Sequence, residues 1–166
     1  MAHIALLRVD SRLIHGQVVT AWVKVTQAKR IIIIDDWCAK DALSAQVFAM
    51  AAPPGVKVEV ITVDDAAKAW QDDEFGALGP VLVLFKSVKG AFESYEKGIC
   101  FEKLQIGGIA GGPGRVAVEG TIALNEEDAK MLQALADHGV AITFQLTTDT
   151  KIKEWRSVKE KYFPQI

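Results

Sequence analysis

The stretch SRLIHGQVVTAW places a histidine beside the start of a helical pattern, with charged residues just before it. Arg8 and Arg12 precede His15, and Asp10 lies between the two arginines. A neutral imidazole is a nucleophile, and arginines neutralise phosphate through several N–H donors. The predicted helix begins near Gly16, where free N–H groups and the helix dipole favour an anion. These residue types predict a phosphate pocket with His15 as the candidate nucleophile.

The role of Asp10 is open between two interpretations. It either holds one arginine or orients the imidazole of His15, since one ring nitrogen must be fixed if the other is to react. A lone histidine is more often structural than catalytic, so a packing role for His15 is the competing interpretation. A metal site is not predicted, because His3 lies in the first strand pattern and His138 ends a distant helix pattern. This spacing matches no metal-ligand motif.

Other polar positions carry weaker signals. Ser87 follows an apolar run and either donates a hydrogen bond to a phosphoryl oxygen or caps a helix. Asp35 and Asp36 end another apolar run, and a solvated pair is favoured there over a magnesium site. The glycine-rich stretch at 107–115 lacks the lysine of a nucleotide-binding P-loop and precedes a strand pattern, so it predicts a turn-forming loop, with a site-lining role as the alternative.

Composition favours a globular protein of 166 residues, with residues 1–166 as a single domain. The formal net charge of −2 argues against nucleic-acid binding. The longest apolar run, at 31–34, is too short to cross a bilayer, and charge appears too early for a signal peptide, so a cytoplasmic protein is expected. Cys38 and Cys100 are isolated and are expected to be reduced, buried thiols.

Short apolar runs alternate with helical patterns along the chain, which predicts an α/β fold of three layers: an open, mainly parallel twisted sheet with helices on both faces. The predicted strands are 3–8, 30–35, 56–62, 80–85, 103–108 and 140–146.

Three further segments have defined patterns. Residues 16–26 form a predicted amphipathic helix with Val25 among its inward residues, and Asn125 is the predicted cap of a second helix. A third helix is expected over 149–162, with Ile152 on its buried side. Two short strand patterns around Gly120 predict a hairpin.

The chain also resembles a known family. The segment LLRVDSRLIHGQVVTAW resembles the active-site segment of the IIB subunits of the mannose, fructose and sorbose group of the bacterial phosphoenolpyruvate-dependent sugar phosphotransferase system (PTS). The similarity continues through IIIIDDWCAKD, AAPPGVKVEVITVDDAA, VLVLFKSVKGAFESYEKGI, KLQIGGI and LADHGVAITFQL. One departure is QLTTDT, where relatives often have a proline after the last strand.

The resemblance implies that His15 accepts a phosphoryl group on Nδ1 from a phosphohistidine of a IIA domain or subunit. It then passes the group to a sugar held by the membrane components IIC and IID. The resemblance makes Arg8, Asp10 and Arg12 parts of the His15 loop, with Gly16 and Gln17 opening the helix behind it. It implies no metal, nucleotide or other cofactor, because the donor is a phosphorylated protein, and a cytoplasmic protein associated peripherally with the permease. The sugar and any homo-oligomer stay open.

Two alternative functions use the same residues. A histidine phosphatase is suggested by the IHG sequence, although Ile14 stands where that family has arginine. A non-catalytic module that binds a phosphometabolite is the other alternative, and it predicts binding without covalent labelling.

Overall fold

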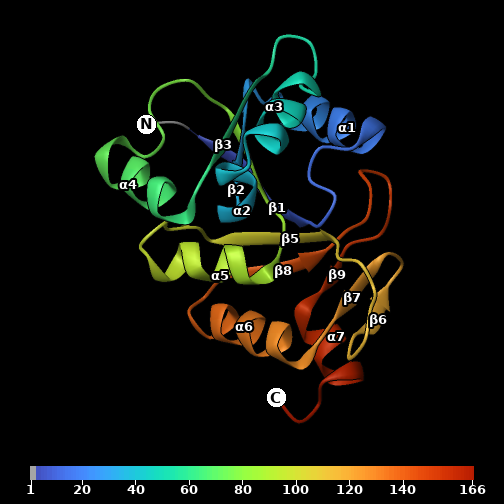
Figure 1. The fold of residues 1–166 in the computed structure, drawn as a ribbon. Helices are drawn as coiled ribbons and strands as arrows, with labels where there is room; N and C mark the ends of the chain where they lie inside the picture. The colour runs from blue at the N-terminus through green and yellow to red at the C-terminus, as the bar shows by residue number, and fades with distance from the viewer. Residues whose placement is uncertain (1–2) are drawn as a thin grey trace.

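The computed structural model describes residues 3–166, which form a seven-stranded sheet covered on both faces by helices (Figure 1). The strand order is β3-β2-β4-β1-β5-β8-β9, and all pairs are parallel except β8 with β9. The strands are β1 (Ile4–Asp10), β2 (Arg30–Ile34), β3 (Lys57–Ile61), β4 (Val81–Phe85), β5 (Lys103–Gly108), β8 (Ala141–Phe144) and β9 (Lys153–Glu154). The helices are α1 (Gly16–Thr26), α2 (Asp36–Lys40), α3 (Ala42–Met50), α4 (Val63–Asp73), α5 (Val88–Glu96), α6 (Glu126–Asp137) and α7 (Trp155–Tyr162). The predicted fold class is confirmed.

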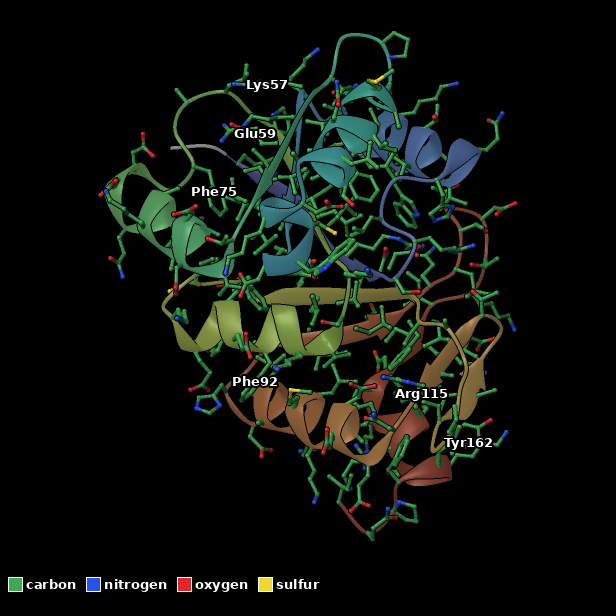
Figure 2. The ribbon with its side chains drawn as sticks, in the orientation of Figure 1. Lys57, Glu59, Phe75, Phe92, Arg115 and Tyr162 are labelled. Atoms are coloured by element: carbon green, nitrogen blue, oxygen red, sulfur yellow. The ribbon has the colours of Figure 1, made fainter. Side chains whose placement is uncertain are left out.

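Continuous apolar runs form the central strands because helices cover both sheet faces. All four isoleucines of β2 and all five residues of β4 are buried. Their side chains alternate between two clusters, one beneath α1, α2 and α3 and the other beneath α4, α5, α6 and α7. Figure 2 shows Phe92 of α5 pointing into the space between α5 and α6.

The helix ends and the hairpin follow the sequence signals. The side chain of Asn125 accepts a hydrogen bond from the N–H of Asp128, whose carboxylate accepts one in return, and together they form the capping box of α6. The predicted hairpin is a separate antiparallel pair, β6 (Val116–Glu119) and β7 (Ile122–Leu124). Both predictions are confirmed.

Three expectations at the periphery are wrong. Val25 is 64% exposed, because it lies about 120° around the helix from Val19, which is buried. The last helix begins at Trp155 rather than at residue 149, and Ile152 before it is 61% exposed, because the chain first adds the short strand β9 to the sheet edge. Cys100 is exposed in the connection between α5 and β5, whereas Cys38 is buried as expected. No helix formed by residues 3–166 is long and apolar enough to span a membrane.

Candidate functional site

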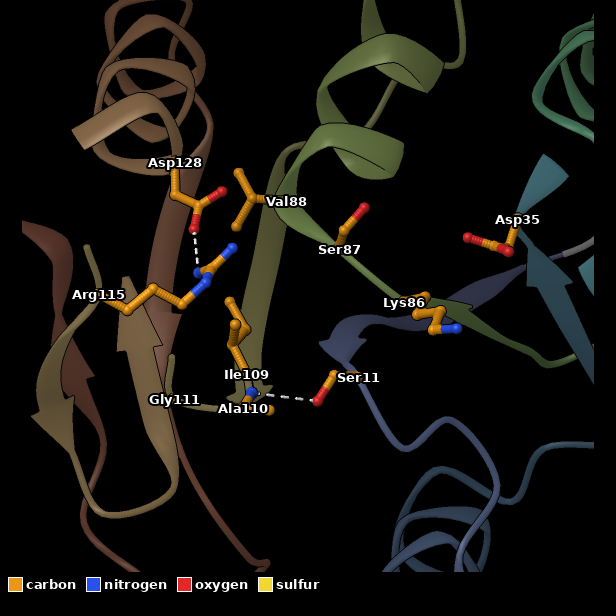
Figure 3. A pocket seen from close by; sticks show the side chains of 10 residues that line it. All are labelled: Ser11, Asp35, Lys86, Ser87, Val88, Ile109, Ala110, Gly111, Arg115 and Asp128. Atoms are coloured by element: carbon orange, nitrogen blue, oxygen red, sulfur yellow. Dashed lines mark hydrogen bonds and ion pairs between the residues drawn. The ribbon is translucent and has the colours of Figure 1, made fainter. Parts of the chain in front are cut away.

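The candidate site lies where β1 ends, between the ends of β4 and β5. The chain leaves β1 toward one side of the sheet and returns to β5 on the other, so this position is the switch point at which open α/β sheets bind ligands. A cavity of about 370 Å³ opens there (Figure 3). Ser11 closes one wall by accepting a hydrogen bond from the backbone N–H of Ala110 at 3.2 Å. The loop of His15 therefore begins at the cavity wall.

His15 is the N-cap residue of α1, and its extended backbone turns the chain from the loop into the helix. Its ring is partly exposed, and Nε2 lies 3.1 Å from Oδ2 of Asp10. An ionised carboxylate only accepts hydrogen bonds, so Nε2 must carry the proton of that bond. In the neutral ring, Nδ1 then keeps its lone pair. Asp10 therefore fixes the tautomer that leaves Nδ1 nucleophilic.

Asp10 is buried, yet it stays ionised. Burial alone raises the pKa of this carboxyl, but hydrogen bonds from Arg12 and His15 outweigh burial and hold the pKa below its usual value. Arg12 donates its backbone N–H at 3.0 Å, its Nε at 3.2 Å and its Nη2 at 3.3 Å. Both interpretations of Asp10 apply at once, because it holds an arginine and orients the imidazole.

Arg8 lies beneath the loop rather than in an open pocket. Its side chain is 2% exposed, and its Nη1 and Nη2 donate to the backbone oxygens of Gln145 and Leu146, both at 2.8 Å. Its Nη2 also lies 3.5 Å from Oδ2 of Asp10, and its guanidinium carbon lies 5.0 Å from the ring centre of Trp22. Burial lowers the pKa of Arg8 to about 10, so the group is charged at neutral pH. Arg8 thus supports Asp10.

Glycines make room for these buried charges at the end of β5. A Cβ atom on Gly107 would overlap the guanidinium of Arg8. A Cβ atom on Gly108 would lie 3.0 Å from Oδ1 of Asp10. The sequence places these two glycines in a predicted strand and in the glycine-rich stretch 107–115, but it does not show which charges they accommodate, because those side chains come from β1.

Among the other predicted site residues, Ser87 lines the cavity, whereas Arg12, Gly16 and Gln17 belong to the His15 loop and the start of α1. Arg12 is 47% exposed and therefore presents part of its guanidinium to solvent beside His15. Gly16 begins α1 with φ +49°, a left-handed conformation that favours glycine, and Gln17 is exposed on the first turn. Ser87 caps α5 by accepting a hydrogen bond from the N–H of Gly90 at 3.1 Å, so the capping role is confirmed.

The cavity also brings in Lys86 and Asp128, which the sequence prediction missed, and residues of the stretch 107–115, which it gave a site-lining role as an alternative. Arg115 pairs with Asp128 on one side of the cavity, and Lys86 lies on the other side, near Asp35 (Figure 3). The ammonium of Lys86 lies 5.4 Å from the ring centre of Trp37, which is 64% exposed. The glycine-rich loop contributes Ile109 to Gly111 to the lining, which supports the site-lining alternative. Lys86 and residues 109–111 share one signal, a position directly after a strand, whereas Arg115 comes just before β6.

The acidic residues after β2 have structural partners. Asp35 accepts a hydrogen bond from the N–H of Cys38 at 3.0 Å, and Asp36 accepts one from the N–H of Val63 at 2.8 Å. Within residues 3–166, no three histidine, cysteine, aspartate or glutamate side chains gather in a way that could hold a metal ion.

Comparison with known proteins decides the family. The profile described as "PTS system sorbose subfamily IIB component" matches residues 4–163. The chain belongs to this family of PTS IIB components. It is 31% identical to the sorbose-specific EIIB component of Klebsiella pneumoniae over 96% of this chain and 98% of that protein. The crystal structure of manxB from Thermoanaerobacter tengcongensis is 38% identical, with a TM-score of 0.91 and 99% of each chain covered.

The family gives this IIB component a general role, phosphotransfer in PTS sugar transport. The mannose-specific EIIAB component of Escherichia coli is 30% identical over 90% of this chain, which spans 46% of that longer protein. The crystal structure of the IIBSor domain of the sorbose permease from Klebsiella pneumoniae has a TM-score of 0.87 at 30% identity, covering 96% of this chain and 98% of that one.

Proposed function

We propose that this IIB component is a phosphocarrier that accepts a phosphoryl group on Nδ1 of His15 from a phosphohistidine of a IIA partner. It then passes the group to a sugar held by membrane IIC and IID components. The observation that carries the proposal is the bond between Nε2 of His15 and the buried, ionised Asp10. This bond leaves Nδ1 as the ring nitrogen with a free lone pair.

The transfer needs no proton to leave Nδ1. Its lone pair attacks phosphorus, a new N–P bond forms, and the N–P bond of the donor breaks with its electron pair returning to the donor imidazole. The ring of His15 gains positive character, which the carboxylate of Asp10 stabilises through Nε2–H. In the second step a sugar hydroxyl oxygen attacks phosphorus, its proton leaves to a base or to water, and the electron pair returns to Nδ1.

The remaining residues of the site position the phosphoryl group and neutralise its charge. Arg12 has exposed N–H groups beside His15 that can donate to phosphoryl oxygens, while its other donors bind Asp10. Gly16 and Gln17 open the first turn of α1, whose N–H groups and dipole favour an anion at His15. Because the donor is already a phosphohistidine, the proposed reaction uses no metal or nucleotide.

The proposed partners follow from the role in transport. One relative is named as a mannose-specific EIIAB component, which supports a IIA partner for this chain. Other relatives are named as fructose-specific and sorbose-specific, so the family does not single out one sugar. The proposed role places the protein in the cytoplasm, at the membrane components that hold the sugar.

Labelling with a phosphorylated IIA protein tests the proposal. We expect the wild-type chain to gain one acid-labile phosphoryl group, seen as an increase in intact mass. A His15→Gln variant should gain none. His138→Gln is the matched control, because His138 is an exposed histidine at the end of α6 and should leave labelling unchanged. Equal labelling of His15→Gln and wild type would refute the proposal. Saturable binding of a phosphometabolite by a wild-type chain that gains no covalent label would favour the phosphometabolite-binding alternative.

A further inference from the structure

Two buried glutamines form a polar chain that ends at Arg8. Gln105 on β5 is 7% exposed, and its Oε1 accepts a hydrogen bond from Nη1 of Arg8 at 2.5 Å. The Nε2 of Gln105 donates to Oε1 of Gln145 at 3.2 Å. Gln145 is 8% exposed, and its own Nε2 donates to the backbone oxygen of Thr150 at 3.1 Å. Each group therefore donates to the next, from Arg8 through Gln105 and Gln145 to the loop after β8.

The amide orientations are set by their neighbours. Arg8 has only donors, so Gln105 must turn its oxygen toward Arg8 and its nitrogen toward Gln145. The oxygen of Thr150 accepts only, so Gln145 must turn its nitrogen toward it. A buried amide is costly unless its groups are paired, and here each amide has a donor and an acceptor in use.

The same oxygen of Asp10 faces both His15 and Arg8. Nε2 of His15 lies 3.1 Å from Oδ2, and Nη2 of Arg8 lies 3.5 Å from it. Three other acceptors hold the guanidinium at shorter distances than this oxygen does, namely Gln105 and two backbone oxygens of the loop after β8. A guanidinium that lost one of these acceptors would move toward Asp10 and compete with His15 for Oδ2.

We propose that Gln105 and Gln145 are positioning residues for phosphoryl transfer, acting through Arg8 and Asp10 on His15. They keep the guanidinium of Arg8 at 3.5 Å from Oδ2 of Asp10, so that this oxygen is available to hold Nε2–H of His15. The inference rests on the proposed function of His15. It extends the site to a buried residue pair on β5 and directly after β8, neither of which faces the cavity.

Nitrogen NMR of the free protein tests the expected effect on the tautomer of His15. We expect His15 of the wild type to be neutral with its proton on Nε2, and a Gln105→Met variant to show a mixture of Nε2–H and Nδ1–H rings. Methionine keeps the length of the side chain but offers Arg8 only a weak sulfur acceptor. Gln71→Met is the matched control, because Gln71 is an exposed glutamine on α4.

The rate of labelling from phosphorylated IIA tests the expected effect on phosphoryl transfer. We expect Gln105→Met to slow labelling by about tenfold, as is typical when a residue that orients a functional side chain is lost. Gln105→Glu keeps an acceptor for Arg8 but loses the donor to Gln145, so relative to Gln105→Met it should restore part of the rate and of the Nε2–H ring. A purely structural role would change the midpoint of thermal unfolding without changing the tautomer.

Two outcomes separate the inference from the proposed function. If Gln105→Met keeps both the wild-type tautomer and the wild-type rate while His15→Gln blocks labelling, the positioning role is refuted and the carrier role stands. If His15→Gln is still labelled, the carrier role fails. Should Gln105→Met not fold, Gln145→Met replaces it: the backbone oxygen of residue 145 still binds Arg8, but Nε2 of Gln105 loses its acceptor, so the Gln105 amide is no longer held with its oxygen toward Arg8. Gln145→Met should then shift the tautomer in the same direction, and an unchanged ring would refute the inference.

Discussion

Replacing Gly107 with alanine tests whether the buried Arg8 supports the site. The added methyl group would occupy the place of the Arg8 guanidinium. An arginine end is usually free to swing aside, but here Gln105, Gln145 and Leu146 hold it through three hydrogen bonds. The clash is therefore relieved only if the guanidinium leaves these acceptors or if β1 and β5 separate.

The expected cost follows from these two routes. Overpacking a tight core position costs about 1–3 kcal/mol. Breaking a buried charged pair leaves the partner unpaired and costs about 3–5 kcal/mol. We expect Gly107→Ala to lower the free energy of unfolding by about 3 kcal/mol, a large part of the roughly 5–15 kcal/mol that keeps a domain folded.

Urea unfolding followed by circular dichroism measures this cost. Gly111→Ala is the control, because a Cβ atom there meets no other atom within 4 Å. A double-mutant cycle with Arg8→Ala isolates the clash, since removal of the guanidinium should make Gly107→Ala nearly neutral. An equal loss of stability in both backgrounds, or a loss below about 1 kcal/mol in the wild-type background, would refute the reasoning.

Three further predictions concern ionisation and capping. Asp10 has a lowered pKa in the fold, so its ionised form stabilises the protein above about pH 4, and this contribution is lost as the pH falls further. The difference in the free energy of unfolding, measured in urea, between wild type and Asp10→Asn should therefore shrink from about pH 7 to about pH 3. A difference that stays constant over this range would contradict the prediction. Burial raises the pKa of Cys38 to about 11, so a thiol reagent should modify only the exposed Cys100 in the native protein and both thiols in denaturant. Rapid reaction of two native thiols would be inconsistent with the structure. Ser87→Ala removes the α5 cap and should cost about 1 kcal/mol in unfolding experiments, whereas the exposed Ser157→Ala should cost little.

The central sheet was predictable because each strand carries its own signal. An uninterrupted run such as Ile31 to Ile34 is compatible with burial on both faces, and the structure buries it on both. The end of the chain was less predictable. Apolar spacing from residue 149 onward fits a helix, but the turn formed by Thr147 and Thr150 and the pairing of β9 with β8 take up the first part of that segment. The turn and the pairing of β9 with β8 overrode the helical pattern.

The chemistry of the site was predictable only for residues close together in the sequence. Asp10 and His15 are five positions apart, and their pairing follows from one loop. Gln105 and Gln145 reach the same site from positions 97 and 137 residues after Arg8, where Gln105 and the backbone oxygen of Gln145 accept its hydrogen bonds. No local pattern connects such positions, because parallel strands bring them together only after the crossovers are made.

Arg8 near the end of β1 and Arg12 in the loop have different roles because their surroundings differ. Arg8 is 2% exposed and donates its hydrogen bonds to acceptors within the protein, so its charge stabilises the folded structure. Arg12 is 47% exposed and bonds a carboxylate that it shares with His15. In the proposed transfer, a phosphoryl group arriving at His15 would add negative charge at the surface, where Arg12 is the more exposed of the two arginines. The same carboxylate would thus hold the imidazole before transfer while the exposed guanidinium adjusts to the new charge, which lets the site bind a phosphoryl group without rearranging its buried support.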